Sequence, residues 1–355
     1  MQRAYFMILL IGLAGCVAAP TAPEAGPPRA SVAAVSSTVP SRGGIFAADR
    51  RLEWTVNLGN ALEAPAEGDW GVTLQADYFR VIAEAGFTAV RVPINFAAHA
   101  GSLAPYLIDP AFLDRVDWVV RNAGYRGLVA ILDMHNYQAM MDSPSTEQAR
   151  FLVLWRQIAE RFRGTPDDQL YFELLNEPNG NLDNDTWNTT ARQALAAVRL
   201  TNPTRPVIIG PSVWNSFDQV PSLDLPDDSN LIVTFHYYLP FEFTHQGAEW
   251  VVGSNAWLGT LWDGEPAQRT AIAGDFDRVA AWAKAHDRPV FLGEFGAYSK
   301  GDQASRVRWT AAVARAADQR GFAWGYWEFC AGFGAYDPVA LQWRTDLLQA
   351  LIPPP

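Results

Sequence analysis

Residues 170–178 read LYFELLNEP, a short apolar run that ends in an amide, a carboxylate and a proline. The run from Leu170 to Leu175 has the length and character of a buried strand, which places Asn176 and Glu177 at its carboxyl end. Pro178 removes a backbone donor and restricts the residue before it, so the strand must stop there. The stretch therefore predicts a strand that delivers a carboxylate to its carboxyl end.

The same pattern recurs along the chain. Short apolar runs rich in β-forming residues cover 54–58, 88–93, 128–134, 170–175, 206–209, 231–235, 289–292 and 323–327. Amphipathic stretches between and after them predict helices over 74–85, 110–123, 147–162, 186–200, 268–286, 305–320 and 339–351. Eight such units over about 310 residues are the count of a (β/α)8 TIM barrel, although a doubly wound parallel sheet gives a similar alternation.

Polar or aromatic side chains follow almost every one of these runs. They are Asn57 and Asn60, Arg91, Asp133, His135 and Asn136, Asn176 and Glu177, Trp214, His236 and Tyr238, Glu294, and Trp327 with Glu328. In a (β/α)8 barrel the carboxyl ends of all strands meet at one face, where active sites lie. This loading of one face favours the barrel and predicts an enzyme.

Composition excludes several other classes of protein. The chain has 355 residues, of which 49% are hydrophobic and 18% charged, so it can bury a large core and is not a disordered polyelectrolyte. Its formal net charge of −11 has the wrong sign for neutralising phosphates, which argues against nucleic acid as a partner. The sequence also lacks a Gly-x-Ser-x-Gly elbow, a phosphate-binding loop and a dinucleotide glycine motif.

The first residues predict export and a lipid anchor. Arg3 precedes an apolar run over 4–14, which is too short to span a bilayer but suits a signal peptide. Residues 13–16 read LAGC and resemble a bacterial lipobox, so we expect a lipoprotein signal peptide over 1–16 and lipidation of Cys16. The alternative is cleavage after Ala19, which would leave a freely secreted protein. Cys330, the other cysteine, then has no disulfide partner.

The rest of the chain divides into two predicted parts. Residues 17–42 are rich in Pro, Ala and Ser without apolar periodicity, which indicates a tether. Residues 43–355 carry all the predicted strands and form the catalytic domain, which we expect to be a monomer.

Two carboxylates stand at the ends of the fourth and seventh predicted strands. Glu177 follows the fourth run and Glu294 follows the seventh, so both point into the mouth of a barrel. Two carboxylates that face each other across a cleft can divide a glycosidic displacement into acid catalysis and nucleophilic attack.

These residues carry a family resemblance. Arg91-Val92-Pro93-Ile94, Asn176-Glu177-Pro178, His236-Tyr237-Tyr238 and Gly293-Glu294-Phe295-Gly296 together resemble glycoside hydrolase family 5, the cellulase and mannanase family, over residues 43–352. Residues 57–65 (NLGNALEAP) and 241–250 (FEFTHQGAEW) resemble a branch with thermophilic endoglucanases that act on glucan and mannan chains. The resemblance implies the barrel, a retaining mechanism, Glu177 as acid/base, Glu294 as nucleophile and no cofactor.

The neighbouring side chains suit these roles. Arg91 would hold positive charge beside Glu294, although a core ion pair with Glu173 is an alternative. Tyr238 could donate its hydroxyl to Glu294, and His236, two positions earlier on the same face, could orient Glu177 or the sugar.

Sugar contacts are expected from residues at the strand ends and in the loops. The expected set is Asn60, Glu63, Arg91, His135, Asn136, Asn176, His236, Tyr238, His245, Trp250, Trp327 and Glu328. Trp70, Trp214, Trp250 and Trp262 are candidate stacking platforms among 14 tryptophans that mostly fill the core. Relatives in the resembling branch carry a histidine where this chain has Asn136. A metal site at His135 and His236 is a weak alternative, because no cluster has metal-ligand spacing.

The leading prediction is an endo-β-1,4-glycanase that hydrolyses β-1,4-glucans and glucomannan. A dedicated β-mannanase is the alternative within the enzyme class. A non-catalytic glycan-binding surface lipoprotein would keep the aromatic platforms and lose the carboxylates, so the presence of both Glu177 and Glu294 argues against it.

Overall fold

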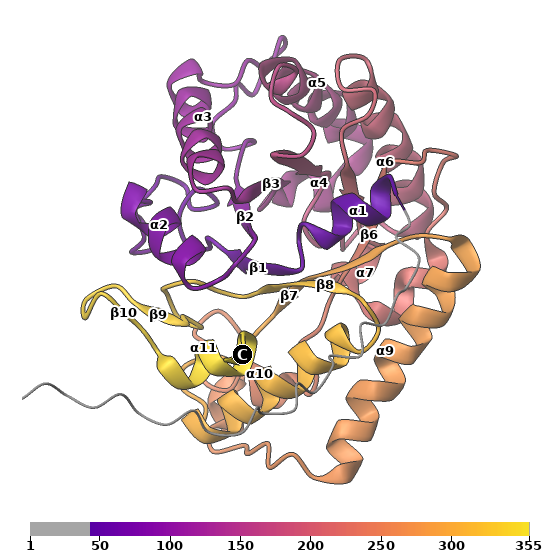
Figure 1. Cartoon of the computed structure of the whole chain (residues 1–355). Coiled ribbons are helices and arrows are strands. Elements are labelled where there is room, and N and C mark those ends of the chain that lie inside the picture. The colour runs from indigo at the N-terminus through magenta and orange to yellow at the C-terminus, as the bar shows by residue number, and fades with distance from the viewer. Residues whose placement is uncertain (1–42, 355) are drawn as a thin grey trace, which may run out of the picture. The chain divides into compact units, whose positions relative to one another are not determined.

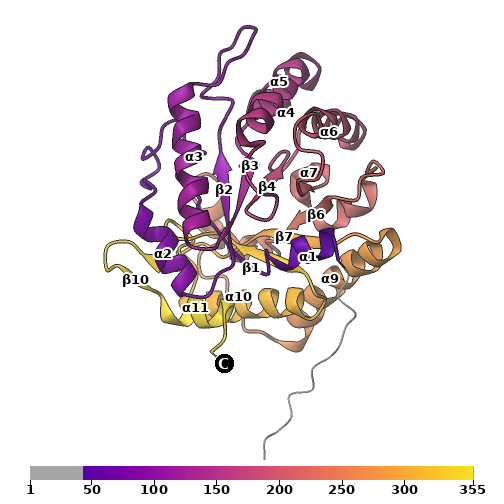
Figure 2. The same ribbon diagram turned by 45° about the horizontal axis from the view of Figure 1, so that its top comes forward.

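Eight parallel strands close into a barrel in the computed structural model, which describes residues 43–354 (Figures 1 and 2). The strands are β1 Trp54–Asn57, β2 Ala89–Ile94, β3 Val129–Met134, β4 Leu170–Glu173, β5 Val207–Ile209, β6 Leu231–His236, β7 Val290–Phe295 and β8 Ala323–Tyr326. Neighbours follow chain order, and β8 pairs with β1. The predicted TIM barrel is therefore confirmed, and the doubly wound sheet is excluded.

Helices surround the strands, as Figure 2 shows. They are α2 Ala76–Glu84, α3 Pro110–Tyr125, α4 Gln138–Asp142, α5 Pro144–Phe162, α6 Asn184–Arg199, α9 Pro266–His286, α10 Gln303–Asp318 and α11 Thr345–Leu351. The loops after β5 and β6 contain short pieces only, namely α7 Ser212–Asn215, η1 Phe217–Ser222, α8 Phe241–Thr244 and η2 Ser254–Trp257. No long helix lies between β5 and β6 in the described residues, and the sequence predicts none there.

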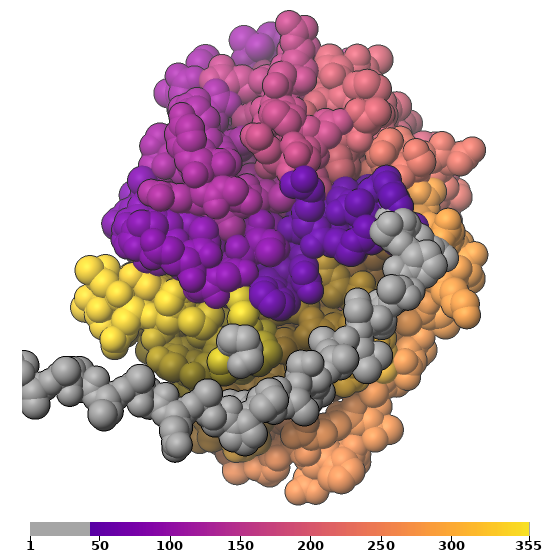
Figure 3. Space-filling model, viewed as in Figure 1, coloured from indigo at the N-terminus to yellow at the C-terminus, as the bar shows by residue number. Residues whose placement is uncertain are grey.

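The amino-terminal end of the barrel is closed by a helix that the sequence did not reveal. Helix α1, Ile45–Arg50, precedes β1 and brings Ile45 and Leu52 onto an apolar layer inside the barrel, which includes Ile131 and Tyr171. The N-terminal and C-terminal parts of the barrel lie against each other on the face shown in Figure 3, as the β1–β8 pairing requires. Because the apolar layer closes the amino-terminal end of the barrel, active-site side chains are restricted to the carboxyl end.

The prediction of one helix over 339–351 is wrong in its first half. Residues 336–343 form a small antiparallel hairpin, β9 Tyr336–Asp337 with β10 Gln342–Trp343, and α11 begins only at Thr345. The Asp337 carboxylate accepts hydrogen bonds from the backbone N–H groups of Val339 and Ala340, both at 3.0 Å, which forms a turn in place of a helix start.

The predicted signal peptide, the lipidation site Cys16 and the tether over 17–42 lie outside the described residues. Within residues 43–354, no helix combines the length and apolar character needed to cross a bilayer. Cys330 is buried and carries a free thiol.

Strand alternation creates the floor of the site. Above the apolar layer, the next inward-facing positions on β2, β3 and β4 are Arg91, Asp133 and Glu173, two residues beyond Ala89, Ile131 and Tyr171 respectively. All three charged side chains are fully buried. The barrel therefore changes from an apolar interior to an ionic layer one step before its carboxyl end.

Candidate active site

A cleft of about 1210 Å³ lies at the carboxyl ends of the strands. Its lining includes most of the predicted site residues, namely Asn60, Glu63, Trp70, His135, Asn136, Asn176, Glu177, Trp214, His236, Tyr238, His245, Trp250, Glu294 and Trp327. Side chains from seven of the eight strand ends thus meet in one place, as the position of the polar clusters predicted.

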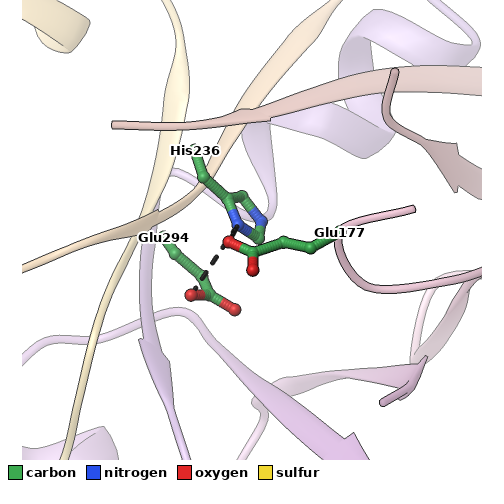
Figure 4. A group of neighbouring side chains, drawn as sticks. All are labelled: Glu177, His236 and Glu294. Atoms are coloured by element: carbon green, nitrogen blue, oxygen red, sulfur yellow. Dashed lines mark hydrogen bonds and ion pairs between the residues drawn. The ribbon is translucent and has the colours of Figure 1, made fainter. Parts of the chain in front are cut away.

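The two predicted carboxylates face each other in this cleft, with His236 beside them (Figure 4). One oxygen of Glu177, one oxygen of Glu294 and one ring nitrogen of His236 all lie within 4.8 Å of one another. Inverting glycosidases separate their carboxyl groups by roughly 6.5–9.5 Å to admit a water, whereas retaining ones hold them about 5–5.5 Å apart. The arrangement has the short separation of the retaining class.

Arg91 is the hub of the ionic layer. Its Nε and Nη2 atoms donate to both oxygens of Glu173, at 2.7 and 2.9 Å, and Nη1 donates to Glu294 at 2.7 Å. Nη2 also donates to Asn176 Oδ1 at 2.8 Å and lies 3.0 Å from Asp133. The pairing with Glu294 and the alternative pairing with Glu173 are therefore both present. Arg91 is fully buried and is not part of the cleft lining, so its predicted contact with sugar is wrong. Asn176 Oδ1 already accepts a hydrogen bond from Arg91, so the side-chain N–H groups of Asn176 are the atoms that can donate to a sugar hydroxyl.

Glu294 is held in its ionised form. Burial by itself would raise its pKa, but His236, Arg91 and His135 outweigh burial and lower the pKa of Glu294 to about 2. The Tyr238 hydroxyl contributes by donating to Glu294 Oε2 at 2.8 Å, as predicted. An ionised, buried carboxylate whose oxygens are fixed by two donors has the charge and the orientation of a nucleophile.

Glu177 sits in a different environment from Glu294. Its side chain is 26% exposed, against 6% for Glu294, and its Oε1 lies 2.8 Å from Nδ1 of His236. His236 thus orients the carboxyl group of Glu177, which was one of its two predicted roles. Burial would lower the pKa of His236, but Glu294 and Glu177 outweigh burial and raise it.

The β1 and β3 ends form one wall of the cleft. His135 lies 2.5 Å from Asp133 through Nδ1, and its ring stacks on Trp327 with centroids 5.8 Å apart. Asn136 has a left-handed φ of 54° and donates from Nδ2 to the Glu63 carbonyl at 3.1 Å. The Glu63 carboxylate in turn accepts from the backbone N–H of Asn60. Asn136 is therefore part of this wall and points its amide at the loop after β1.

Aromatic side chains form the outer walls, with one correction. Trp70, Trp214 and Trp250 line the cleft and are 45%, 57% and 60% exposed, as expected of stacking platforms. Trp262 is 1% exposed and lies outside the cleft lining, where Arg269 covers its ring, so its predicted role as a platform is wrong. It belongs to the core under the loop that follows β6.

Glu328 is the second correction. Its side chain is fully buried and does not line the cleft. Its two oxygens accept hydrogen bonds from the backbone N–H groups of Cys330, Ala331 and Phe333 at 2.8–3.0 Å, and burial raises its pKa to about 7. The predicted contact with substrate is therefore wrong, because this carboxyl group caps its own loop.

Several lining residues were not predicted. They are Val213, Ser216, Phe217, Tyr237, Leu239, Phe241, Val251, Tyr298, Ala331, Gly332 and Phe333. Most lie in the long loops after β5, β6, β7 and β8, where no periodicity indicates which side chains turn inward. His245 was predicted, and it stacks on Phe241 with centroids 4.0 Å apart. Burial lowers the pKa of His245 to about 4, so its ring is neutral at pH 7.

The trio of Glu177, His236 and Glu294 is the group of described residues whose atoms approach metal-ligand spacing. Its carboxylate oxygens already accept from Arg91, Tyr238 and His236, and Arg91 brings a cation to the same place. Both carboxylates therefore already have hydrogen-bond partners within the protein.

Comparison with known proteins agrees with this geometry. Residues 56–332 match the family model described as cellulase (glycosyl hydrolase family 5). The chain belongs to glycosyl hydrolase family 5. The family-5 match begins inside β1 and extends past the end of β8, so the resemblance predicted from the sequence motifs is confirmed.

Relatives within family 5 include proteins with solved structures. Endoglucanase Cel5A from the hyperthermophilic Thermotoga maritima is 45% identical with a TM-score of 0.85, over 87% of this chain and all of that one. Endoglucanase H from Acetivibrio thermocellus is 38% identical over 312 residues, which is 86% of this chain and 33% of that protein. Cellulase/esterase CelE from the same organism is 31% identical. The chain spans about a third of the length of these last two relatives.

Removing the hub should be far more damaging than removing a surface arginine. Arg91→Met removes the cation shared by the buried carboxylates of Asp133, Glu173 and Glu294, so we expect the free energy of unfolding to fall by about 3–5 kcal/mol or more. The control is Arg51→Met, because Arg51 pairs with Asp168 in solvent with side chains 52% and 57% exposed; it should cost about 0–1 kcal/mol. Urea unfolding at pH 7 measures both values. Equal losses in the two variants would contradict the role of Arg91.

Proposed function

We propose that this chain is a retaining endo-β-1,4-glycanase that hydrolyses β-1,4-glucans and glucomannan. The observation that carries the proposal is that one carboxylate oxygen of Glu177 and one of Glu294 lie within 4.8 Å of each other in the cleft. The site of this chain has both carboxylates and the donors that hold them, so a merely glycan-binding protein does not account for it. Endoglucanases among the relatives, and solved structures of Thermotoga maritima Cel5A with cellobiose and with mannotriose, support the substrate class.

The proposed reaction has two displacements. Glu177 protonates the glycosidic oxygen while Glu294 attacks the anomeric carbon, which gives a covalent glycosyl-enzyme and releases the first product. Glu177 then takes a proton from water, which attacks the same carbon and releases Glu294. His236 holds Glu177 in place, and the free amide of Asn176 donates to the sugar 2-hydroxyl. The exposed rings of Trp70, Trp214 and Trp250 line the cleft, which suits binding of several sugar units of one chain.

Substitution of the two carboxylates separates their roles. Glu294→Gln removes the nucleophile, so we expect kcat on cellotetraose to fall by about 10⁴-fold or more. Glu177→Ala removes the acid, and it should recover most of the first step with aryl glycosides whose leaving group needs no proton. Steady-state rates on both substrates measure this difference. Equal losses on both substrates in the Glu177 variant would contradict its assignment as the acid.

The Tyr238 hydroxyl should set the acidic limb of the pH profile. Tyr238→Phe removes a donor that lowers the pKa of Glu294, so we expect that pKa to rise. As the pH falls, Glu294 then becomes protonated at a higher pH than in the unsubstituted enzyme. We expect the acidic limb of kcat/KM to move upward by about 0.5–1 pH unit, the worth of one hydrogen bond. The control is Tyr298→Phe, which also lines the cleft but donates to Glu249. An acidic limb that moves equally in both variants would contradict this account.

Asn136 should tune the choice between glucose and mannose units. Mannose differs from glucose in the orientation of the 2-hydroxyl, and a single adaptable hydrogen bond discriminates weakly, so rates on the two should lie within about two powers of ten. Asn136→His replaces an amide in the cleft wall by a ring, at a left-handed position that His also tolerates. We expect the substitution to change the ratio of kcat/KM on cellotetraose to kcat/KM on mannotetraose, and to leave the free energy of unfolding almost unchanged. An unchanged ratio would remove Asn136 from the sugar site.

We also propose that Cys16 carries a lipid anchor, based on the LAGC stretch before it. One acyl chain binds membranes only marginally, so we expect the several chains of a mature bacterial lipoprotein. Cys16→Ser should release the protein from the membrane fraction while its specific activity stays the same, since the barrel is unchanged. Fractionation followed by assay measures both. Membrane association that survives the substitution would contradict the lipobox.

A further inference from the structure

The turn after β5 has a strained backbone. Val213, Trp214 and Asn215 have φ angles of 60°, 57° and 51°, so three consecutive non-glycine residues occupy the left-handed region. This region disfavours L-residues, and a β-branched residue such as Val most of all. Strain of this kind persists where the surrounding structure fixes the position of a side chain. We therefore ask which contacts fix the positions of these three side chains.

The turn is bonded to the segment that carries Glu177. The Trp214 backbone N–H donates to the Pro178 carbonyl at 3.1 Å, and the Ser212 hydroxyl donates to the Leu182 carbonyl at 2.7 Å. Trp214 is thereby turned into the cleft, whereas Asn215 is fully buried behind it. The strained residues thus give the turn two faces, one toward substrate and one toward the protein interior.

The buried face meets His236. Asn215 Nδ2 lies 3.4 Å from Nε2 of the ring, the nitrogen that does not face Glu177, and Asn215 Oδ1 is buried without a hydrogen-bond partner among residues 43–354. Two glycines leave room for this contact. A Cβ at Gly210 would lie 2.4 Å from Asn215 Oδ1, and a Cβ at Gly293 would lie 3.0 Å from His236 Nε2. The packing is built around the amide and the imidazole.

The amide can present either an acceptor or a donor to the ring. Its oxygen and nitrogen have nearly the same size, so a half-turn of the amide group places Oδ1 toward Nε2 and moves Nδ2 beside Gly210. In that orientation the unpaired oxygen accepts from Nε2–H. Nδ1 is then the ring atom that exchanges a proton with Glu177, either accepting from the carboxylic acid or donating to the carboxylate. Both stages of the proposed reaction keep the same Nε2–H···Oδ1 bond.

We propose that Asn215 is a positioning residue, which holds Nε2–H of His236 through Oδ1 so that the exchangeable proton stays between Nδ1 and Glu177. This inference rests on the proposed function, since it needs Glu177 to be the acid and base. Among residues 43–354, no other side chain forms a hydrogen bond with Nε2. Asn215 touches neither sugar nor reacting atoms in this account, and acts only through the ring.

Four other charged groups act on the ring of His236, namely Glu177, Glu294, Arg91 and Glu173. Glu177 faces Nδ1 at 2.8 Å, and the Glu294 carboxylate from β7 lies 3.7 Å from the same nitrogen. Arg91 from β2 and Glu173 from β4 act on the ring through space. These groups stay unchanged when Asn215 is replaced, so a shift in the pH profile reports the lost amide.

Two substitutions of similar size should move the basic limb of kcat/KM in opposite directions. Asn215→Leu leaves Nε2–H buried and unpaired, so the Glu177–His236 pair gives up its proton at lower pH, by about half a unit or more. Asn215→Asp strengthens the acceptor, so the pair keeps its proton to higher pH, and the rate stays closer to that of the unsubstituted enzyme. Circular dichroism checks that both variants are folded.

The possible outcomes distinguish a failure of this inference from a failure of the proposed function. Upward shifts in both variants would mean that Nδ2 donates to an unprotonated Nε2, and would overturn the proposal. Reduced rates with an unmoved basic limb would mean a purely structural role, and would also overturn it. An enzyme inactive on β-1,4-glucans before any substitution would refute the proposed function instead.

A measurement on the unsubstituted protein serves if neither variant folds. Nitrogen NMR of the His236 ring should show Nε2 carrying a hydrogen throughout about pH 5–8, while Nδ1 changes with pH. A resonance of Nε2 without a hydrogen in that range would overturn the inference without recourse to activity.

Discussion

A buried guanidinium is the constraint on which the rest of this site depends. Removing a cation from water is expensive, and it is tolerated only where opposite charges and hydrogen bonds surround it. Arg91 on β2 meets this need with Asp133 on β3, Glu173 on β4 and Glu294 on β7, while its Nη1 also donates to Asn57 on β1 at 2.9 Å. One side chain thereby ties five of the eight strands together at the end where the cleft opens.

The same network makes two glutamates chemically different. Glu294 points into the ionic layer, where His236 and Arg91 keep it ionised in spite of its burial. Glu177 stands one step further out, partly exposed to the cleft, and contacts the ring of His236 instead of the guanidinium. Two identical side chains can take different chemical roles in one site when their surroundings differ in this way. The proposed roles, Glu294 as nucleophile and Glu177 as acid, follow from this difference in depth within the barrel.

The sequence predicted most of what depends on strand periodicity. Glu177, Glu294, Arg91 and the His236–Tyr238 pair were found because parallel strands end at one face and alternate positions share a side. Glu328 was misassigned because its two-residue distance from β8 resembles the others, while three backbone N–H groups of its own loop capture it. Trp262 lies in the long loop after β6, and Asn215 in a left-handed turn, where no period tells the inner face from the outer.

The central claim is that Glu294 forms a covalent bond with the sugar, and trapping that species tests it most directly. A 2-deoxy-2-fluoro cellobioside with a good leaving group slows both displacements but should let the first proceed, so the adduct accumulates. Mass spectrometry of proteolytic fragments should find the added sugar on the peptide that contains Glu294, and on none when Glu294 is replaced by Gln. An unmodified protein that releases a first product of inverted anomeric configuration would contradict the account.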